Sequence, residues 1–529
     1  MFLKKSHHHH HHHHHHHRSE KWEEVAASGY RTPRWFLKVA ALLVALFCVP
    51  FATILTVFFA LPPVYDQTFV GVLGDKFDLL KEADDGKVVV IGGSSVAFGL
   101  DSELLSEQLG RDVVNFGLYA DLGTKIMMDL SKANIAAGDI IILAPEMNAQ
   151  TLSLYFNGPT TLQTLDGNAE MLKYIPTEHY EALIGASYEF VSNKLGFLLS
   201  GTKPDSGNPA YQKDNFNAYG DNVYDRPYNE MTGVTNQITL DFYADFEDKT
   251  VTEYEEYLNY VNDYVAYANK EGATVYFSFP PMNETALSEK VTEESIDRFY
   301  DNLRKSLDCK VISSVYDYIM DEGYFYDSEF HLNNAGVIAR TVQLAKDVKR
   351  TLLINSPVKV EVPEPPGYRP VERPSEVSEE DLKNAANFLL ESYQFGTATY
   401  YKIVGLTEQG KTTDTLTIPN FAPDAEGHAI PVVQIAPEAF RDCPTLKTLY
   451  LGDKISLLAN GAFSGSSITA IYIPNGKKPA DISIPNDAPL ATEGCDPSLK
   501  IYIHEDDIED FVNELYFWGN YAQYFDIKP

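Results

Sequence analysis

The sequence predicts an α/β protein with a doubly wound parallel sheet, preceded by one membrane-spanning helix and followed by a short repeat domain. Strand-like and helix-like segments alternate between residues 87 and 353, which is typical of parallel strands joined by right-handed crossovers. A stretch of 23 residues without a charge, Val39–Leu61, comes before them. A repeat of 22 to 23 residues follows a proline-rich segment. With 529 residues, the chain is long enough for two or three domains.

The strand that organises the first domain is Val88–Ile91, a run of four β-branched apolar residues. Such a run predicts a strand that is buried on both faces. Two glycines end it, and an acidic amphipathic segment over residues 100–109 predicts a helix. Further strands are expected at residues 113–116, 139–143, 273–279 and 311–312, and further helices at 122–137, 254–270, 294–307 and 333–353.

Serine, histidine and an acid stand where an acyl-transfer site would need them. Ser94 and Ser95 follow the first strand, at the carboxyl edge of the sheet where open α/β sheets bind their ligands. Asp327 and His331 come just before the closing helix. These groups form a nucleophile, a base and an orienting acid if the fold brings them together. The structural alternative is a glycine-rich turn whose serine caps a helix.

The serine turn resembles a motif of a known family. Gly93-Ser94-Ser95-Val96-Ala97-Phe98-Gly99 is similar to the Gly-Asp-Ser-Leu-Thr-x-Gly block of the SGNH/GDSL hydrolase superfamily. That block places a glycine four residues after the nucleophile, and Gly99 stands four residues after Ser95. On this match Ser95 takes the nucleophile position, and Ser94 stands where the family usually has aspartate.

The second and third blocks of the family imply the oxyanion donors. Asn115-Phe116-Gly117 looks like the second block, whose glycine donates a backbone N–H to the oxyanion. Ala144-Pro145-Glu146-Met147-Asn148 stands where the third block has Gly-x-Asn-Asp. The resemblance therefore implies an oxyanion hole built from the Ser95 N–H, the Gly117 N–H and the Asn148 side chain.

The last block of the family contains the catalytic histidine, and His331 matches it. The usual spacing is Asp-x-x-His, whereas Asp327 lies four residues before His331 and Ser328 occupies the usual acid position. The resemblance covers about residues 86–355 and implies a flavodoxin-like sheet. It also implies a mechanism that uses Ser95, His331 and Asp327 and needs no metal and no cofactor.

The envelope-bound members of the superfamily, such as the teichoic-acid D-alanyl transfer and alginate acetylation proteins, are the most similar. The resemblance thus implies an extracellular esterase or O-acyltransferase that acts on cell-envelope polysaccharide. A transferase would take its acyl group from a donor or from a membrane acyltransferase partner. The second hypothesis is a surface adhesion or scaffold protein whose SGNH-like domain has lost activity. The spacing of Asp327 and the repeat domain favour that alternative.

The N-terminal region predicts where the protein is located. Residues 36–61 are long and apolar enough to span a bilayer, and no small-residue cleavage site follows them. Basic residues precede the span and acidic residues follow it. The positive-inside rule then places residues 1–35 in the cytoplasm and residues 62–529 outside. His7–His17 is either a purification tag or a native metal-binding tract, and builds no core.

Composition argues against nucleic-acid binding and does not decide whether the cysteines form a disulfide bond. The chain has 42 Lys+Arg against 75 Asp+Glu, a net charge of −33, which argues against nucleic-acid binding. The four cysteines form no disulfide framework. A Cys443–Cys495 bridge is one alternative, and small buried core residues are the other.

Three segments flank or interrupt the α/β domain. Residues 62–85 are a juxtamembrane segment. Residues 150–245 form an insertion rich in Asn, Tyr and Gly, which is either a sugar-binding surface or an irregular cap with its own small core. Residues 356–378 contain many prolines and predict a semi-rigid linker.

The C-terminal domain, residues 379–529, contains the repeat. The segment Ile435–Phe440 recurs as Leu458–Phe463, and short strands fit residues 416–418, 449–451, 471–473 and 501–503. This period is typical of a solenoid, in which each repeat buries its face on its neighbours. It resembles the BspA-type leucine-rich repeat of bacterial surface proteins. A helix is expected over residues 381–393 and a C-terminal cap after residue 503.

Overall fold

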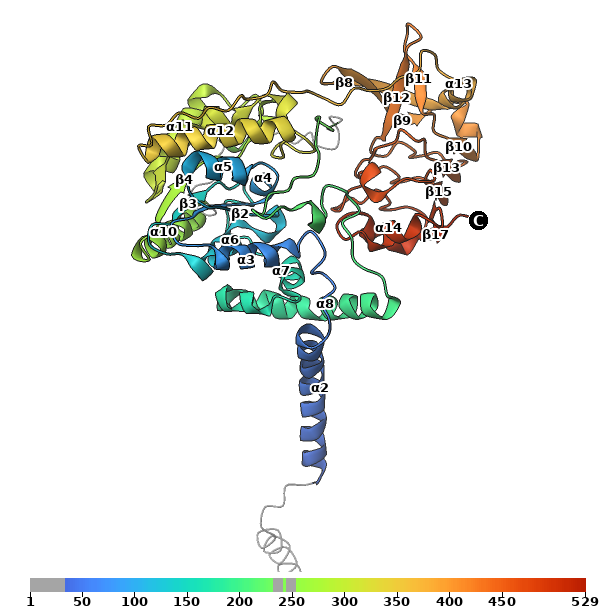
Figure 1. The fold of residues 1–529 in the computed structure, drawn as a ribbon. Coiled ribbons are helices and arrows are strands. Elements are labelled where there is room, and N and C mark those ends of the chain that lie inside the picture. The colour runs from blue at the N-terminus through green and yellow to red at the C-terminus, as the bar shows by residue number, and fades with distance from the viewer. Residues whose placement is uncertain (1–33, 232–240, 244–253) are drawn as a thin grey trace, which may run out of the picture. The chain divides into compact units, whose positions relative to one another are not determined.

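The computed structural model describes residues 34–231, 241–243 and 254–529 (Figure 1). Five strands form the central sheet of its first half. In spatial order they are β2 (Val113–Gly117), β1 (Val88–Gly92), β3 (Ile140–Leu143), β4 (Thr274–Phe277) and β6 (Lys310–Val311), and all neighbours are parallel. The predicted α/β architecture with a parallel sheet is confirmed, and each strand lies within two residues of its expected bounds.

The order of the strands creates a crevice at one edge of the sheet. From β1 the chain passes through α4 (Ser94–Ala97) and α5 (Ser102–Leu109) to β2, and it returns through α6 (Thr124–Ser131) to β3, on the other side of β1. The connections that leave β1 and β3 therefore diverge, and ligands of open α/β sheets bind where they do. Ser94 follows β1 and Glu146 follows β3, so both residues lie at this edge.

Helices cover both faces of the sheet (Figure 1). α5 and α12 (Asn334–Thr351) pack on one face, where they share a buried apolar cluster with β1 and β3. α3 (Val72–Glu82) and α6 pack on the other face. α10 (Glu255–Lys270) connects to β4, and α11 (Glu293–Ser306) connects β4 to β6. Asn333 caps α12, because its side chain accepts the N–H of Gly336.

The insertion and the juxtamembrane segment pack on this α/β domain. α7 (Gly158–Leu165) and α8 (Tyr180–Ser200) form the first part of the insertion, and irregular chain with few regular elements follows to residue 231. α3 lies in the segment 62–85 and contacts β2, α6 and α7. Two short parallel strands, β5 (Met282–Asn283) and β7 (Ile319–Met320), pair with each other and follow β4 in the chain. The sequence did not predict α3, α8 or this pair.

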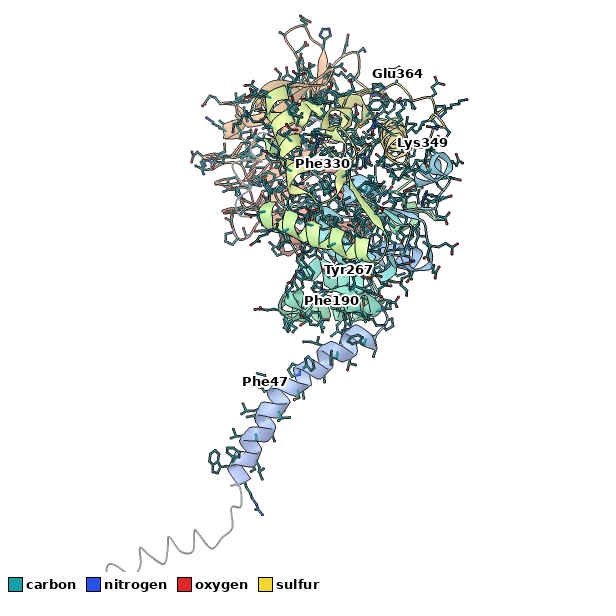
Figure 2. The ribbon with its side chains drawn as sticks, turned by 90° about the vertical axis from the view of Figure 1, so that its left-hand side faces the viewer. Phe47, Phe190, Tyr267, Phe330, Lys349 and Glu364 are labelled. Atoms are coloured by element: carbon teal, nitrogen blue, oxygen red, sulfur yellow. The ribbon has the colours of Figure 1, made fainter. Side chains whose placement is uncertain are left out.

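The N-terminal helix α2 (Arg34–Phe59) has 26 residues and a mean hydropathy of 2.6 in its most apolar part. Its apolar side chains, Phe47 among them, project outward from the helix (Figure 2). Among the described residues, α2 is the one helix that is long and apolar enough to be a membrane span or a signal sequence. Met1–Leu61 and Pro62–Pro529 are separate compact units.

The C-terminal region contains two further sheets. β10 (Thr415–Thr417), β13 (Thr448–Tyr450), β15 (Ala470–Tyr472), β16 (Lys500–Ile503) and β17 (Phe525–Ile527) pair in parallel and in register. The expected repeat strands are therefore present, and their central residues are buried in one cluster. The second sheet contains β8 (Phe388–Phe395), β9 (Ala398–Leu406), β11 (Phe421–Pro423), β12 (Ala429–Ile435) and the short β14 (Leu457–Leu458). α14 (Ile508–Asn513) precedes β17.

One helix was predicted too long, and the disulfide alternative is absent. The helix expected over residues 381–393 ends at Ala385, as α13 (Glu379–Ala385), and the chain continues as strand β8. Pairing with β9 and burial of Phe388 override the local helix pattern, as tertiary context commonly does. All four cysteines are unpaired.

Candidate active site

Ser94, His331 and Asp327 form a hydrogen-bonded relay at the carboxyl edge of the sheet. His331 Nε2 lies 2.8 Å from Ser94 Oγ, and His331 Nδ1 lies 2.7 Å from Asp327 Oδ1. Because a carboxylate can only accept, Nδ1 carries the proton and Nε2 accepts from the serine hydroxyl. This is the geometry in which a histidine can withdraw a proton from a nucleophile.

The turn that presents Ser94 requires glycine at two positions. A Cβ on Gly93 would lie 2.5 Å from Glu146 Oε2, and one on Gly92 would lie 2.5 Å from Val96. Both contacts are shorter than ordinary Cβ contacts, so a side chain at either position would force the neighbouring atoms to move. Ser94 is the first residue of α4, which points its hydroxyl toward the loop that carries His331.

Ser95 does not occupy the position that the sequence analysis expected. Its side chain is fully buried, and its Oγ has no hydrogen-bond partner among the described residues. Its N–H donates to Glu146 Oε1 at 2.7 Å, and its carbonyl accepts from Arg340. Adjacent residues of a helix point about 100° apart. Since Ser94 faces His331, Ser95 is turned into the interior of the domain.

The four-residue spacing of Asp327 and His331 is accommodated by Ser328. The Ser328 hydroxyl accepts the N–H of His331 at 3.1 Å and that of Phe330 at 3.3 Å. Tyr326 N–H also donates to the His331 carbonyl at 2.9 Å. These bonds close a tight turn that returns Asp327 to the side of the imidazole. Ser328, which stands at the usual acid position of the family, therefore shapes the loop.

The environment of Asp327 favours its charged form. Burial by itself would raise the pKa of the carboxyl, but the imidazole of His331 and the hydrogen bonds from His331 and Tyr211 outweigh it. The guanidinium of Arg226 acts in the same direction. The pKa of Asp327 consequently lies below its ordinary value. A carboxylate that stays charged can hold the imidazole in one tautomer.

The insertion contributes a residue to this relay. The Tyr211 hydroxyl donates to Asp327 Oδ2 at 3.0 Å and lies 3.1 Å from His331 Nδ1. Burial and the adjacent Asp327 hold the pKa of Tyr211 well above its usual range, so the hydroxyl keeps its proton. Phe98 stacks on the imidazole, with ring centroids 4.7 Å apart. The tyrosine-rich composition of the insertion was noted in the sequence, but nothing in it singled out Tyr211.

A buried arginine ties the insertion to the two halves of the site. Arg226 donates to the carbonyl of Leu332 at 2.9 Å and to that of Phe98 at 3.0 Å. Its guanidinium also lies 5.1 Å from the centre of the Phe98 ring. Arg226 therefore links the serine turn to the histidine loop. A lone arginine in an irregular segment gave no sequence signal of this role.

The expected oxyanion donors are only partly in place. The Gly117 N–H is directed at Asn115 Oδ1, 3.2 Å away, and a Cβ on Gly117 would lie 2.6 Å from the Gly93 carbonyl. Gly117 thus lies beside the serine turn. The Asn148 Oδ1 accepts the N–H of Thr151 and so closes the turn that follows.

Glu146, and not Asn148, contacts the serine turn. Besides accepting the Ser95 N–H through Oε1, the carboxylate is 2 % exposed, and its Oε2 has no hydrogen-bond partner among the described residues. A buried carboxylate therefore lies directly beside the serine turn.

Side chains that could bind a metal ion lie together in the C-terminal region, away from the relay. Among the described residues, Asp424, Glu426 and His428 have ligand atoms within 4.8 Å of one another, on the loop between β11 and β12. The relay itself contains one histidine and one carboxylate, which is fewer ligands than a zinc site uses. The expectation that the reaction needs no metal and no cofactor stays a prediction.

Comparisons with known proteins identify no family. No family model matches the chain, and no curated protein matches it. Among solved structures, a leucine-rich repeat protein from Bacteroides ovatus is similar to part of it, with 19% sequence identity and a TM-score of 0.15. The match covers 22% of this chain and 37% of that protein, so the chain spans little more than a third of its length.

Proposed function

We propose that the protein is a serine esterase or O-acyltransferase of the SGNH type, with Ser94 as its nucleophile. The observation that carries the proposal is the relay Ser94–His331–Asp327, with heavy-atom distances of 2.8 and 2.7 Å. With Ser94 as the nucleophile, the family block is matched one residue earlier. Gly92-Gly93-Ser94 then stands at Gly-Asp-Ser, Gly93 replaces the aspartate, and Phe98 stands where the block has its last glycine.

The proposed reaction uses the relay twice. The Ser94 hydroxyl attacks an ester carbonyl while His331 Nε2 takes its proton, which gives an acyl-enzyme after the leaving alcohol receives that proton. Water, or the hydroxyl of an acceptor, then attacks the acyl-enzyme with His331 as the base. Asp327 and Tyr211 hold the imidazole in place. The Ser95 N–H, next to the nucleophile, donates to Glu146 Oε1, so it can hold the oxyanion only once that bond is broken. Such a donor is worth roughly 10²–10³-fold in rate.

The proposed substrate is an acylated polysaccharide of the cell envelope, and the proposed location is the outer face of the membrane. Support for the location comes from α2, which is apolar enough to span a bilayer, and from the basic residues around Lys38 at its start. A transferase of this kind would receive its acyl group from a donor or a membrane acyltransferase. Protease treatment of intact cells should remove residues 62–529; protection until lysis would refute the location.

A fluorophosphonate probe on the full chain tests the nucleophile and the enzyme together. We expect covalent labelling of Ser94, no labelling of Ser94→Ala, and retained labelling of Ser95→Ala. The two serines are adjacent, so each variant is the matched control for the other. Labelling that persists in Ser94→Ala and disappears in Ser95→Ala would overturn the assignment.

The alternative function is a surface adhesion or scaffold protein that uses the SGNH-like and repeat domains for binding. One observation favours it: Ser94 and His331 are each only 7% exposed, so little of the relay is open to a substrate. The same probe separates the two functions. A folded chain with a cooperative melt that no fluorophosphonate labels would support the scaffold and refute the enzyme.

A further inference from the structure

An exposed apolar stripe runs along α8 of the insertion. Tyr180, Ile184 and Tyr188 are spaced four residues apart, and the half-buried Leu195 and the exposed Leu199 continue the same face of the helix. Ile184 is 69%, Tyr188 80% and Leu199 86% exposed. A soluble surface seldom leaves a row of large apolar side chains uncovered, and such rows mark contacts with a membrane or a protein.

The opposite face of α8 is firmly attached to the segment that leaves α2. Asp166 accepts the N–H groups of Val64 and Tyr65 through Oδ2, at 2.7 and 3.1 Å. Its other oxygen lies 2.7 Å from the buried ammonium group of Lys194, which belongs to α8. This carboxylate therefore joins α8 to the chain just after α2.

The ring of Tyr65 strengthens that attachment. It packs against Phe190 and Phe197 of α8, with ring centroids 5.7 and 6.1 Å apart. Figure 2 shows Phe190 within the layer of side chains around α8. Tyr65 is 1% exposed, so this contact is part of the core.

Chain length then limits how far α8 can be from a bilayer. α2 ends at Phe59, and Val64 is already bonded to Asp166, so four residues separate the two. The five Cα–Cα steps from Phe59 to Val64 span at most about 18 Å when fully extended. If α2 crosses the membrane, Val64 and the Asp166 carboxylate that pairs with Lys194 of α8 stay near the surface from which α2 emerges, whatever the angle between the two parts.

We propose that α8 lies in the interface of the bilayer that α2 spans, with its apolar stripe among the headgroups and upper acyl chains. The occupant of the stripe is thus lipid. Interfacial helices bury an apolar face about 5–10 Å deep, which suits side chains of this size. Glu181 and Glu189 are exposed beside the stripe, so the attraction comes from apolar area and does not require anionic lipid. The inference rests on the proposed membrane span and is independent of the proposed catalysis.

The test places a probe on the stripe of the full chain in nanodiscs of phosphatidylcholine. A nitrobenzoxadiazole probe is attached at Tyr188→Cys or, as the matched control, at Leu353→Cys, both in a Cys48→Ser background. Leu353 is 83% exposed and follows α12, on the opposite face of the sheet from α3 and α6. Label on the background chain measures reaction of the native cysteines, and thermal melting checks each fold.

We expect acyl-chain doxyl lipid to lower the emission at position 188 by about twofold and to leave position 353 unchanged. Equal, unquenched emission at both positions in chains that enter the disc would overturn the inference while leaving the span intact. A chain that does not enter the disc would refute the span and the inference together. Concentration-dependent self-crosslinking through position 188, without quenching, would replace lipid by a second copy of the chain and also overturn it.

Discussion

At the scale of single residues, the site depends on which way each side chain points at a turn. Ser94 and Ser95 differ by one position, yet one hydroxyl reaches His331 and the other has no partner. Ser328 closes the loop that brings Asp327 back to His331. Small local geometries of this kind decide which atoms can react.

Glu146→Gln tests the carboxylate beside the serine turn. The amide keeps an oxygen for the Ser95 N–H and offers an N–H in place of the unpartnered Oε2. We expect the initial rate on an aryl acetate to rise about tenfold, since a donor replaces a group that repels a developing oxyanion. Glu329→Gln, another buried carboxylate with an unpartnered Oε2, should change the rate little. A fall to background in Glu146→Gln would contradict this role.

Asp327→Asn tests the electrostatics of the relay through pH. The pKa of Asp327 in the folded protein lies below its ordinary value of 3.8, so the carboxylate contributes stability above that value. That contribution is lost as pH falls through the pKa of the folded state. The melting temperatures of wild type and variant should therefore differ at pH 7 and converge below pH 3.8. A difference that stays constant down to pH 3 would show that packing, and not charge, accounts for it.

At the scale of elements, α3 supports the second strand and the serine turn through one buried cation. Lys76 Nζ donates to Asn115 Oδ1 at 3.2 Å and to the Gly220 carbonyl. Asn115 in turn donates to the Val96 carbonyl and to Asp221. Burial lowers the pKa of Lys76, and the neighbouring Asp221 opposes that shift. α3 lies before residue 86, where the α/β domain was expected to begin, and it thus holds the strand β2, which ends at Gly117.

Lys76→Met tests this network. The substitution keeps the length of the side chain but removes the donor to Asn115 and to the Gly220 carbonyl, and a buried unpaired polar group costs about 1–3 kcal/mol. We expect a loss of about 3 kcal/mol in the free energy of unfolding, measured with urea. Lys81→Met is the matched control on the same helix, because its ion pair with Glu170 is exposed and should matter little. Equal stability of the two variants would refute the network.

At the scale of the whole molecule, the end of the C-terminal region is bonded to the insertion. Asp205 exchanges backbone hydrogen bonds with Asn513 and Leu515, at 3.0 and 3.2 Å. Tyr516 packs on Tyr119, with ring centroids 5.6 Å apart. The proline-rich segment between the two regions does not predict these contacts, since an extended spacer can join domains that touch and domains that do not.

A chain ending at residue 378 tests how much these contacts stabilise the first domain. Removal exposes Tyr119 and frees the chain around Asp205. We expect the melting temperature of that domain to fall by roughly 5 °C, which corresponds to about 3 kcal/mol in a domain of this size. Tyr516→Ala in the full chain should lower it by a smaller amount. An unchanged melt of the truncated chain would show that the two regions are independent.

The sequence alone determined the parallel strands, the helices between them, the apolar N-terminal helix and the repeat strands, because each follows from local apolar periodicity and turn residues. It also marked His331 and Asp327 as candidates. Only the tertiary structure showed that the Ser94 hydroxyl, and not that of Ser95, lies beside His331, because this depends on the direction in which α4 leaves β1. Tyr211 and the apolar stripe of α8 likewise depend on long-range packing of an irregular insertion, which local patterns do not encode.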